Sequence, residues 1–445
     1  MAKNWKEMNS GEKLEARFEK WLSPEGLDFK SLEAKSSYQR KIIRFRDAVQ
    51  LDKTPDRVPI FPFYTFLPAD IYGVTNEQVM YDPEKLASTW MRYLEDYRPD
   101  YYLSPALVST GQALDALDYK LYKWPGHGVP PTSPYQCVEK EYMKEDEYDA
   151  LIEDPSGFWT TRYLPRICGA LDGLKFLGSA VENCELPLLA PMLIPYGLPE
   201  VQSALKALMK AGNAALSWVQ HIGAFEKEAQ ERGFVNGAGG VAKAPFDVLG
   251  DTLRGTQGMM IDMYRHPEKI VKAQERLVPI LIKMGIKASE MSGNPIVFMP
   301  LHKGADGFMS DEQFKKFYWP FLKEVVMGLI EEGCLPLLFA EGGYNTRLEY
   351  LKEIPRGRSI WLFDRTDMCK AKEIVGDTIC MAGNVPASLL VTGTAREVEG
   401  YCKELIDTIG KNGGFIMSSG TSLDEARPES LRAMIEVTRE YGVYK

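Results

Sequence analysis

The chain has 445 residues and a mass of 50.2 kDa, which is long enough to bury a large core. Of its residues, 45% are hydrophobic and 26% are charged, an ordinary composition for a globular protein. This length fits two or three average domains or one elaborated α/β barrel. The formal net charge of −9 argues against non-specific binding to nucleic acid and against docking on anionic membranes.

The start of the chain and the cysteines predict the compartment. The segment MAKNWKEMNSGEKLEARFEKW is charged and amphipathic, unlike a secretory signal. No run approaches the roughly 18 apolar residues that a membrane helix needs. The seven cysteines are odd in number and lack CxxC spacing, so we expect buried thiols in a reducing compartment. The sequence predicts a cytoplasmic protein.

In chain order, residues 1–50 are rich in Lys, Glu and Arg on a helical period, and we predict an N-terminal helical extension there. From about Arg57, short apolar runs alternate with amphipathic stretches. The runs are VPIFPFY (58–64), DYYLSPAL (100–107), LPLLAPMLI (186–194), GFVNGAGGVA (233–242), PIVFMPL (295–301), LPLLFAEGG (335–343), SIWLFDR (359–365), TICMAGN (378–384) and GGFIMSSG (413–420). Most are continuously apolar, as in parallel strands covered on both faces. The sequence therefore predicts an α/β fold, a (β/α)8 TIM barrel over residues 51–445, with a long insertion at about 108–185.

The strand count leaves one choice open. Nine runs are one more than an eight-stranded barrel uses. The extra run is either 186–194 or 233–242, and the sequence does not decide between them.

Polar residues directly after the runs are the candidate site, because the reactive groups of a TIM barrel gather at the carboxyl ends of its strands. Glu341 lies between an apolar strand and two glycines, where a ligand can approach closely, and His302 is the one of the four histidines that follows a confident strand. The predicted catalytic residues are Glu341, His302 and Asp364, and the predicted substrate-binding residues are Tyr64, Asn236, Phe246, Tyr344 and Ser418. A helix-capping role for Asp364 and a structural role for His302 remain alternatives.

Several motifs are absent from the sequence: GxGxxG opening a first βαβ unit, GxxxxGK[ST], HExxH and GxSxG. The sequence therefore has no recognisable loop for binding a nucleotide phosphate, and it carries no signature of a serine hydrolase or a zincin.

The C-terminal half resembles a known superfamily. LPLLFAEGGYNTRLEYLKEI, AKEIVGDTICMAGNVPASLLVTGTAREVE and GGFIMSSGTSLDEARPESLRAMIE are similar to segments of the uroporphyrinogen decarboxylase superfamily, and in particular of its corrinoid-linked methyltransferase branch. The resemblance implies a TIM barrel. True uroporphyrinogen decarboxylases carry an arginine-rich segment after the first strand, and the corresponding stretch of this chain, PIFPFYTFLPADIYG, contains no arginine. A tetrapyrrole with many carboxylates would need basic partners there, so this departure from the family disfavours decarboxylation.

Within that branch, the resemblance favours the methyltransferase I of O-demethylase systems. Members of the branch that activate thiols bind zinc through a His-x-Cys pair and a later Cys. The matching positions here hold Phe339, Glu341 and Thr421, so the thiolate ligands are missing and a thiol acceptor is disfavoured. Glu185, Glu200 and His221 match the Glu-14-Glu-20-His spacing associated with the O-demethylase group, which makes them predicted metal ligands. An unbroken helix from Pro199 would however separate Glu200 from His221 by roughly 32 Å, too far to share one ion unless the chain folds back near residues 212–213.

The resemblance implies an enzyme that cleaves a methyl ether of a methoxylated aromatic compound and passes the methyl group to cobalt. The chain has no DxHxxG segment for a lower cobalt ligand, so we expect the corrinoid (cobalamin) to be carried by a partner protein, with Zn2+ as a second candidate cofactor. Three alternatives stay open: methyl transfer from a methylamine or other donor, a uroporphyrinogen decarboxylase-like activity, and a non-catalytic module that docks a corrinoid protein. The oligomeric state is also open, with a homodimer among the options.

Overall fold

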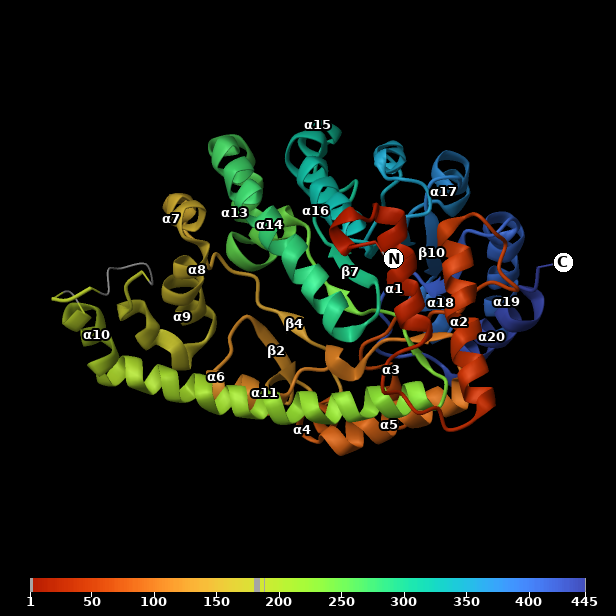
Figure 1. Ribbon diagram of the computed structural model, residues 1–445, viewed down its shortest axis with the longest axis horizontal. Helices are drawn as coiled ribbons and strands as arrows, with labels where there is room; N and C mark the ends of the chain where they lie inside the picture. The colour runs from red at the N-terminus through yellow and green to blue at the C-terminus, as the bar shows by residue number, and fades with distance from the viewer. Residues whose placement is uncertain (1–2, 180–184, 188, 445) are drawn as a thin grey trace.

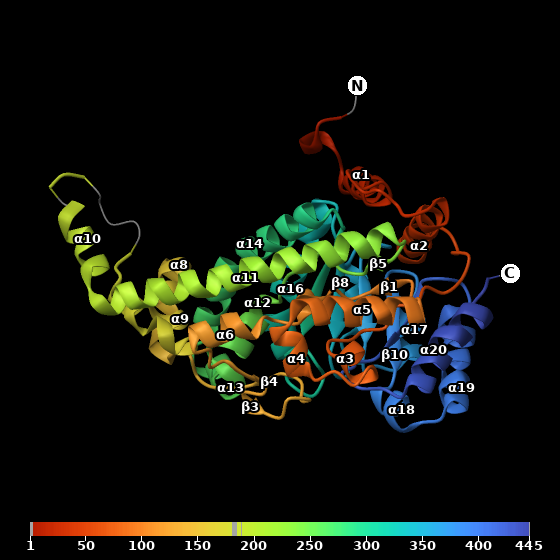
Figure 2. The same ribbon diagram turned by 90° about the horizontal axis from the view of Figure 1, so that it is seen from below.

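The computed structural model describes residues 3–179, 185–187 and 189–444 (Figure 1). Its core is a ring of parallel strands surrounded by helices, and one very long helix runs along one side (Figure 2). The parallel strands are β1 (Tyr101–Tyr102), β5 (Val235–Asn236), β6 (Gly240–Val241), β7 (Ile296–Leu301), β8 (Leu335–Ala340), β9 (Ile360–Phe363), β10 (Cys380–Val385) and β11 (Phe415–Ser419).

The segment 58–64 closes the ring. On one side the backbone N–H of Met417 donates to Pro59 O and that of Phe61 donates to Met417 O, both at 2.9 Å. On the other side Tyr101 N donates to Ile60 O at 3.1 Å, which joins the segment to β1. β1 pairs with β5, β6 pairs with β7, and the order then runs to β11. With β5 and β6 as two halves of one interrupted strand, the described residues form a closed ring of eight, and the predicted barrel is confirmed.

The nine candidate runs are thereby resolved. The run 233–242 contains β5 and β6, whereas residues 189–194 belong to helix α10 (Leu189–Gly197), with residue 188 outside the described residues. The run 186–194 contains one β-branched residue, Ile194, and is otherwise rich in Leu, Ala, Met and Pro. This composition does not favour a strand. The extra run is therefore 186–194.

Aromatic rings fill the interior of the barrel. The ring centroid of Phe63 lies 5.4 Å from that of Phe298 on β7 and 5.0 Å from that of Phe339 on β8. Rings from opposite sides of the ring of strands thus pack against one another, as expected for a barrel with a solid core rather than a pore.

Helices cover the outside of the barrel and build the two additions. The helices around the barrel are α3 (Leu67–Ile71), α4 (Asn76–Tyr81), α5 (Pro83–Tyr97), α12 (Pro245–Asp247), α13 (Gly255–Arg265), α14 (Pro267–Ser292), α15 (Asp311–Gln313), α16 (Trp319–Glu331), α17 (Met368–Val375), α18 (Ala387–Thr392), α19 (Ala395–Leu405) and α20 (Pro428–Tyr441). At the N-terminus, α1 (Ser10–Leu22) and α2 (Leu32–Gln50) pack against the barrel. Gly333, with φ +72°, lets α1 approach so closely that a Cβ there would lie 2.6 Å from the backbone of Lys13.

The insertion is a small sheet with short helices. Its elements are α6 (Gly111–Leu117), β2 (Tyr122–Pro125), β3 (Gly128–Val129), β4 (Gln136–Cys137), α7 (Tyr148–Glu153), α8 (Pro155–Phe158) and α9 (Leu164–Ile167). Helix α11 (Pro199–Glu231) is 33 residues long and contacts both this insertion and α5 beside the barrel (Figure 2). Among the described helices, none combines the length and the apolar character required to cross a membrane.

Candidate functional site

Two side chains meet at the carboxyl end of the barrel. Pro300 of β7 pairs with Phe339 of β8, and His302 and Glu341 each follow two residues later. Because side chains alternate along a strand, both residues continue the inward-facing row of Phe339. The His302 Nε2 atom lies 3.7 Å from Glu341 Oε2. The predicted pair is therefore together, at an accessible mouth, since the two side chains are 34% and 50% exposed.

Asp251 holds the other side of the imidazole. Its Oδ2 lies 2.6 Å from His302 Nδ1, so Nδ1 donates and Nε2 faces Glu341. Asp251 lies in a π-helical turn, Val248–Leu253, and not after a strand, which is why the sequence analysis missed it. This arrangement fixes both the orientation and the tautomer of the ring.

A second carboxylate, Asp247, anchors the backbone segment that carries His302. Asp247 is fully buried and accepts hydrogen bonds from the backbone N–H groups of His302 and Lys303, both at 3.0 Å, and from the Tyr318 hydroxyl at 2.9 Å. Burial and the charge of Asp251 raise the pKa of Asp247. By accepting these three hydrogen bonds, Asp247 positions the residues that follow β7.

Two lysines complete the charge pattern. Lys243 Nζ lies 3.0 Å from Asp251 Oδ2 and Lys303 Nζ lies 3.6 Å from Asp251 Oδ1. Although burial opposes ionisation, the hydrogen bond from His302 and the charge of Lys243 hold the pKa of Asp251 at about 2. These contacts therefore favour the anionic form of Asp251.

The pKa of His302 is raised by this environment. Burial alone would lower it, but the hydrogen bond to Asp251 and the negative charges of Asp251, Asp247 and Glu341 favour the imidazolium. A protonated ring with Nε2 at the barrel mouth can donate a proton to a bound molecule, which is the geometry of a general acid.

The insertion lies close to this group. Besides burial, the charge of Asp251 raises the pKa of the Cys137 thiol on β4 and contributes to raising that of Tyr122 on β2 to about 12.

Three of the predicted substrate-binding residues, Tyr64, Phe246 and Tyr344, are buried. Phe246 and Tyr344 have no exposed surface: the Phe246 ring packs 5.7 Å from that of Tyr318, and the Tyr344 hydroxyl donates to Leu301 O at 3.4 Å. Tyr64 is also buried, with its ring 5.0 Å from that of Tyr93 on α5. The structure thus places all three side chains in the buried core rather than on an accessible wall.

Asp364, Ser418 and Asn236 take three different positions. Asp364 accepts a hydrogen bond from Gly342 N at 3.0 Å, so it braces the loop that carries Glu341. Ser418 is fully buried, and its hydroxyl has no hydrogen-bond partner within the described residues. Asn236 lines a separate cavity on the flank of the barrel.

The flank cavity measures about 580 Å3 and opens where β5 is interrupted before β6. Glu226 of α11 lines it, accepting from the Tyr102 hydroxyl at 2.5 Å and from Asn236 Nδ2 at 3.3 Å. Burial raises the pKa of Glu226. Glu226 could not be predicted from the sequence, because a buried carboxylate on a long amphipathic helix has the same sequence pattern as a solvated one.

The predicted metal ligands do not form a site. Glu200 and His221 both lie on α11, which continues unbroken past residues 212–213, so their backbones are roughly 32 Å apart at 1.5 Å per residue. His221 Nδ1 instead lies 2.8 Å from Ser217 O of the same helix. One zinc ion with ligand distances near 2 Å cannot bridge that gap. Glu185, Glu200 and His221 are therefore corrected: their spacing is not a coordination set.

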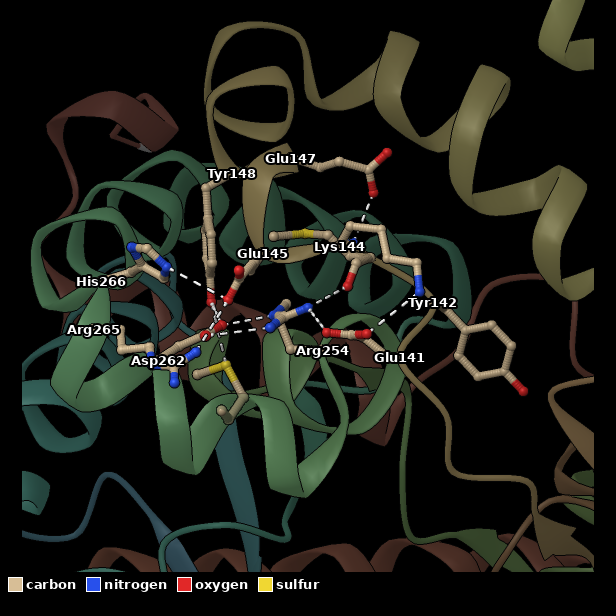
Figure 3. A network of polar contacts seen from close by, with 12 residues as sticks. Glu141, Tyr142, Lys144, Glu145, Glu147, Tyr148, Arg254, Asp262, Arg265 and His266 are labelled. Atoms are coloured by element: carbon tan, nitrogen blue, oxygen red, sulfur yellow. Dashed lines mark hydrogen bonds and ion pairs between the residues drawn. The ribbon is translucent and has the colours of Figure 1, made fainter.

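A different cluster of potential metal ligands lies between the insertion and α13 (Figure 3). Ligand atoms of Glu145, Asp262 and His266 lie within 4.8 Å of one another. The fully buried Asp262 carboxylate already receives hydrogen bonds from Arg254 Nε at 2.6 Å and from the Tyr148 hydroxyl at 2.7 Å. With a guanidinium in contact with its central carboxylate, this cluster fits a structural ion-pair network better than a zinc site.

Comparisons with known proteins agree with the fold and with part of the resemblance. Residues 226–441, just under half of the chain, match the family model of uroporphyrinogen decarboxylase (URO-D). Curated uroporphyrinogen decarboxylases are similar at low identity: 25% over 137 residues for Chlorobium phaeovibrioides, 21% over 183 for Chlorobaculum parvum and 26% over 140 for Neisseria meningitidis. These matches cover 30%, 40% and 30% of this chain and 38%, 51% and 38% of the relatives, so the chain spans about half of their length or less.

A solved structure matches over most of the chain. A methyltransferase from Methanosarcina mazei superposes with a TM-score of 0.55, covering 91% of this chain and 98% of that chain at 13% sequence identity. At this identity the match concerns the fold. Residues 226–441 are therefore similar to the uroporphyrinogen decarboxylase family, and the whole chain shares its fold with a methyltransferase.

Proposed function

We propose that this protein is a methyltransferase that removes the methyl group of a methoxylated aromatic compound and passes it to the cobalt of a separate corrinoid protein. The observation that carries the proposal is the imidazole of His302, held between Asp251 and Glu341 at the mouth of the barrel with a raised pKa. The structural likeness to a methyltransferase supports the reaction class.

The chemistry of ether cleavage explains why such a group is needed. When the methyl carbon–oxygen bond breaks, its electron pair stays on the oxygen, and a phenolate is a poor leaving group unless it gains a proton. In the proposed reaction His302 Nε2 gives its proton to that oxygen, so that the products are a phenol and a transferred methyl cation equivalent. The partner's reduced cobalt supplies the electron pair that accepts the methyl group.

The surrounding residues have positioning roles in this proposal. Asp251 accepts a hydrogen bond from Nδ1–H and favours the protonated ring, and Asp247 fixes the backbone of His302. Glu341, 50% exposed, faces the same nitrogen and is placed to orient the incoming oxygen or to return a proton to the ring. Zinc has no part in the proposal, because neither set of candidate ligands fits the ion.

Two features favour an ether over the alternative of a cationic methylamine. The rings of Phe63, Phe298 and Phe339 pack on one another instead of forming an open cage for a cation. A protonated His302 would also repel a quaternary ammonium group at the mouth. A module that only docks a corrinoid protein would not need an oriented proton donor.

The test is a methyl-transfer assay on the full chain with reduced cobalamin. Vanillate, trimethylamine and uroporphyrinogen are supplied separately, and the free phenol and methylated cobalamin are quantified. We expect turnover with vanillate and a loss of about 10²- to 10⁴-fold in His302→Gln, which removes the acid but keeps a polar group beside Asp251. The matched control is His221→Gln, because His221 lies on α11 and contacts a carbonyl of its own helix instead of the groups around His302. Turnover with another donor alone, or equal rates in the two variants, would refute the proposal.

A further inference from the structure

A second large cavity lies at the opposite end of the barrel from His302. It measures about 630 Å3 and is lined by residues that precede the first three strands of the ring: Arg57 before segment 58–64, Asp100 before β1, and Arg232 before β5. Parallel strands of one ring begin at the same end, so this cavity, here called the basal pocket, is at the amino ends of the strands. It is separate from the mouth.

The basal pocket is strongly basic in a chain whose net charge is −9. Its charged lining residues are Glu33, Arg40, Lys41, Arg44, Arg57, Glu95, Arg98, Asp100, Arg232 and Arg439. Seven of these are cationic and three are anionic, which leaves an excess of four positive charges in one cavity. An acidic protein that gathers cations in a concave site creates a local potential that attracts anions.

Part of this charge is neutralised within the protein. The buried Asp100 carboxylate accepts from Arg44 Nη1 and from both terminal nitrogens of Arg57, each at 2.7 Å. Arg232 pairs with Glu95 and Glu228. These arginines form a rigid wall, because their side chains are held by two or more hydrogen bonds.

Four cations of the pocket have no carboxylate partner within the described residues: Arg40, Lys41, Arg98 and Arg439. Lys41 Nζ donates to Gly233 O at 3.0 Å, and Arg439 Nη2 donates to Arg98 O at 3.0 Å. A backbone carbonyl satisfies a hydrogen bond but supplies no countercharge. Within the described residues, these four cations therefore line the cavity without a carboxylate in contact.

The protein bears a cost for keeping these groups together. Burial lowers the pKa of Lys41 to about 8; the charge of Asp100 opposes this decrease, and the charges of Arg44, Arg57 and Arg439 add to it. Burial and the neighbouring Arg57 likewise lower the pKa of Arg439, against the charge of Asp100. An anion bound among them would relieve this repulsion.

The backbone conformation at Arg98 is a further indication that the pocket has a ligand-binding role. Arg98 ends α5 in the left-handed conformation, with φ 47° and ψ 52°, a position at which glycine is strongly preferred. An arginine there is strained relative to glycine, and its only described side-chain hydrogen bond is a long one, from Nε to Glu95 O at 3.3 Å. A role for its guanidinium in the pocket would explain the choice of residue.

We propose that the basal pocket binds a small molecule carrying two or more phosphate charges, such as a diphosphate ester. Four cations without a carboxylate in contact among the described residues call for a multiply charged anion, and the planar guanidinium fork matches phosphate oxygens in a bidentate way. The volume lies in the range of small-molecule sites. The site is independent of the proposed methyl transfer at the other end of the barrel.

The test measures binding of inorganic pyrophosphate to the full-length protein by isothermal titration calorimetry at constant ionic strength. The variant is Arg40→Gln combined with Arg98→Gln, since both side chains are exposed and neither forms an ion pair with another described residue. The matched control is Lys272→Gln combined with Lys283→Gln, which removes the same charge from an exposed part of α14. Citrate is titrated as a polycarboxylate of comparable charge.

We expect saturable pyrophosphate binding that weakens on the order of tenfold to a hundredfold in the pocket variant and stays within twofold in the control. Three results would overturn the proposal: no saturable binding to the unmodified chain, equal weakening in both variants, or tighter binding of citrate than of pyrophosphate. Because calorimetry needs no methyl-transfer activity, a failure of the proposed function would leave this result readable.

Discussion

The most informative perturbation of the candidate site is Asp251→Asn. It keeps the shape of the side chain but removes the negative charge that lies 2.6 Å from His302 Nδ1. If protonated His302 is the acid, the rate of methyl transfer in the unmodified chain falls as the pH rises through the pKa of His302. Without the anion that pKa drops, so the decline begins at lower pH.

The size of the shift follows from the contacts. Removing one adjacent opposite charge lowers the pKa of a histidine by about 1 to 2 units, each worth about 1.36 kcal/mol. Glu341 and Asp247 remain and keep part of the elevation, whereas Lys243 and Lys303 lose their counterion and oppose it. Above the pKa, the protonated fraction and the rate should therefore fall about 10- to 100-fold, with little change on the acidic side.

The assay is the initial rate of phenol release from vanillate between pH 5.5 and 9. Asp306→Asn is the control, since Asp306 is also a rim carboxylate but bonds to Thr346 and not to His302. The reasoning is refuted if the profile of Asp251→Asn coincides with that of the control, or if it moves to higher pH.

Further outcomes are expected elsewhere. Glu341→Gln should lower the methyl-transfer rate at least tenfold while shifting the free energy of unfolding by less than about 0.5 kcal/mol, because the side chain is half exposed; stopped assays and urea titration measure the two quantities. Arg254→Met should reduce the free energy of unfolding by about 3 to 5 kcal/mol, since it leaves the buried Asp262 carboxylate without its cation, and an unchanged urea midpoint would contradict this. Against the effect of burial, hydrogen bonds and ion pairs with Arg166 and Arg162 hold the pKa of Glu147 at about 2, compared with 4.5 for the free side chain. The contribution of Glu147 to the stability of the folded protein should therefore be complete above pH 4.5 and disappear as the pH falls toward 2. Glu147→Gln should remove that acid dependence in thermal melts. His221→Ala should leave zinc content by elemental analysis unchanged, and a stoichiometric loss of zinc would reinstate the ligand set rejected from the length of α11.

The barrel could be predicted from the sequence because buried parallel strands are continuous apolar runs. The runs that became β7 to β11 are short, bounded by turns and repeated at regular intervals. The same criterion failed at 186–194, where an apolar composition belongs to helix α10 with exposed side chains such as Ile194. Apolarity alone does not separate a buried strand from a helix; the scarcity of β-branched residues was the usable signal.

The site could be predicted only in part. His302 and Glu341 follow strands that pair in register, so the rule that reactive groups lie at strand ends was enough to bring them together. Asp251 is separated from His302 by 51 residues and lies in a π-helical turn, so its contact depends on tertiary packing that no local pattern encodes. The spacing of Glu200 and His221 failed for the opposite reason: a spacing carries no information on whether the intervening chain bends.

The central claim is that the bond between methyl carbon and oxygen breaks and that the methyl group leaves the ring intact. Vanillate labelled with 13C in the methyl group and 18O in the ether position tests this in a single turnover with reduced cobalamin. The account predicts that the 13C appears on cobalt and that all of the 18O stays in the phenol. Release of carbon dioxide from the ring carboxylate, or loss of 18O to water, would contradict it.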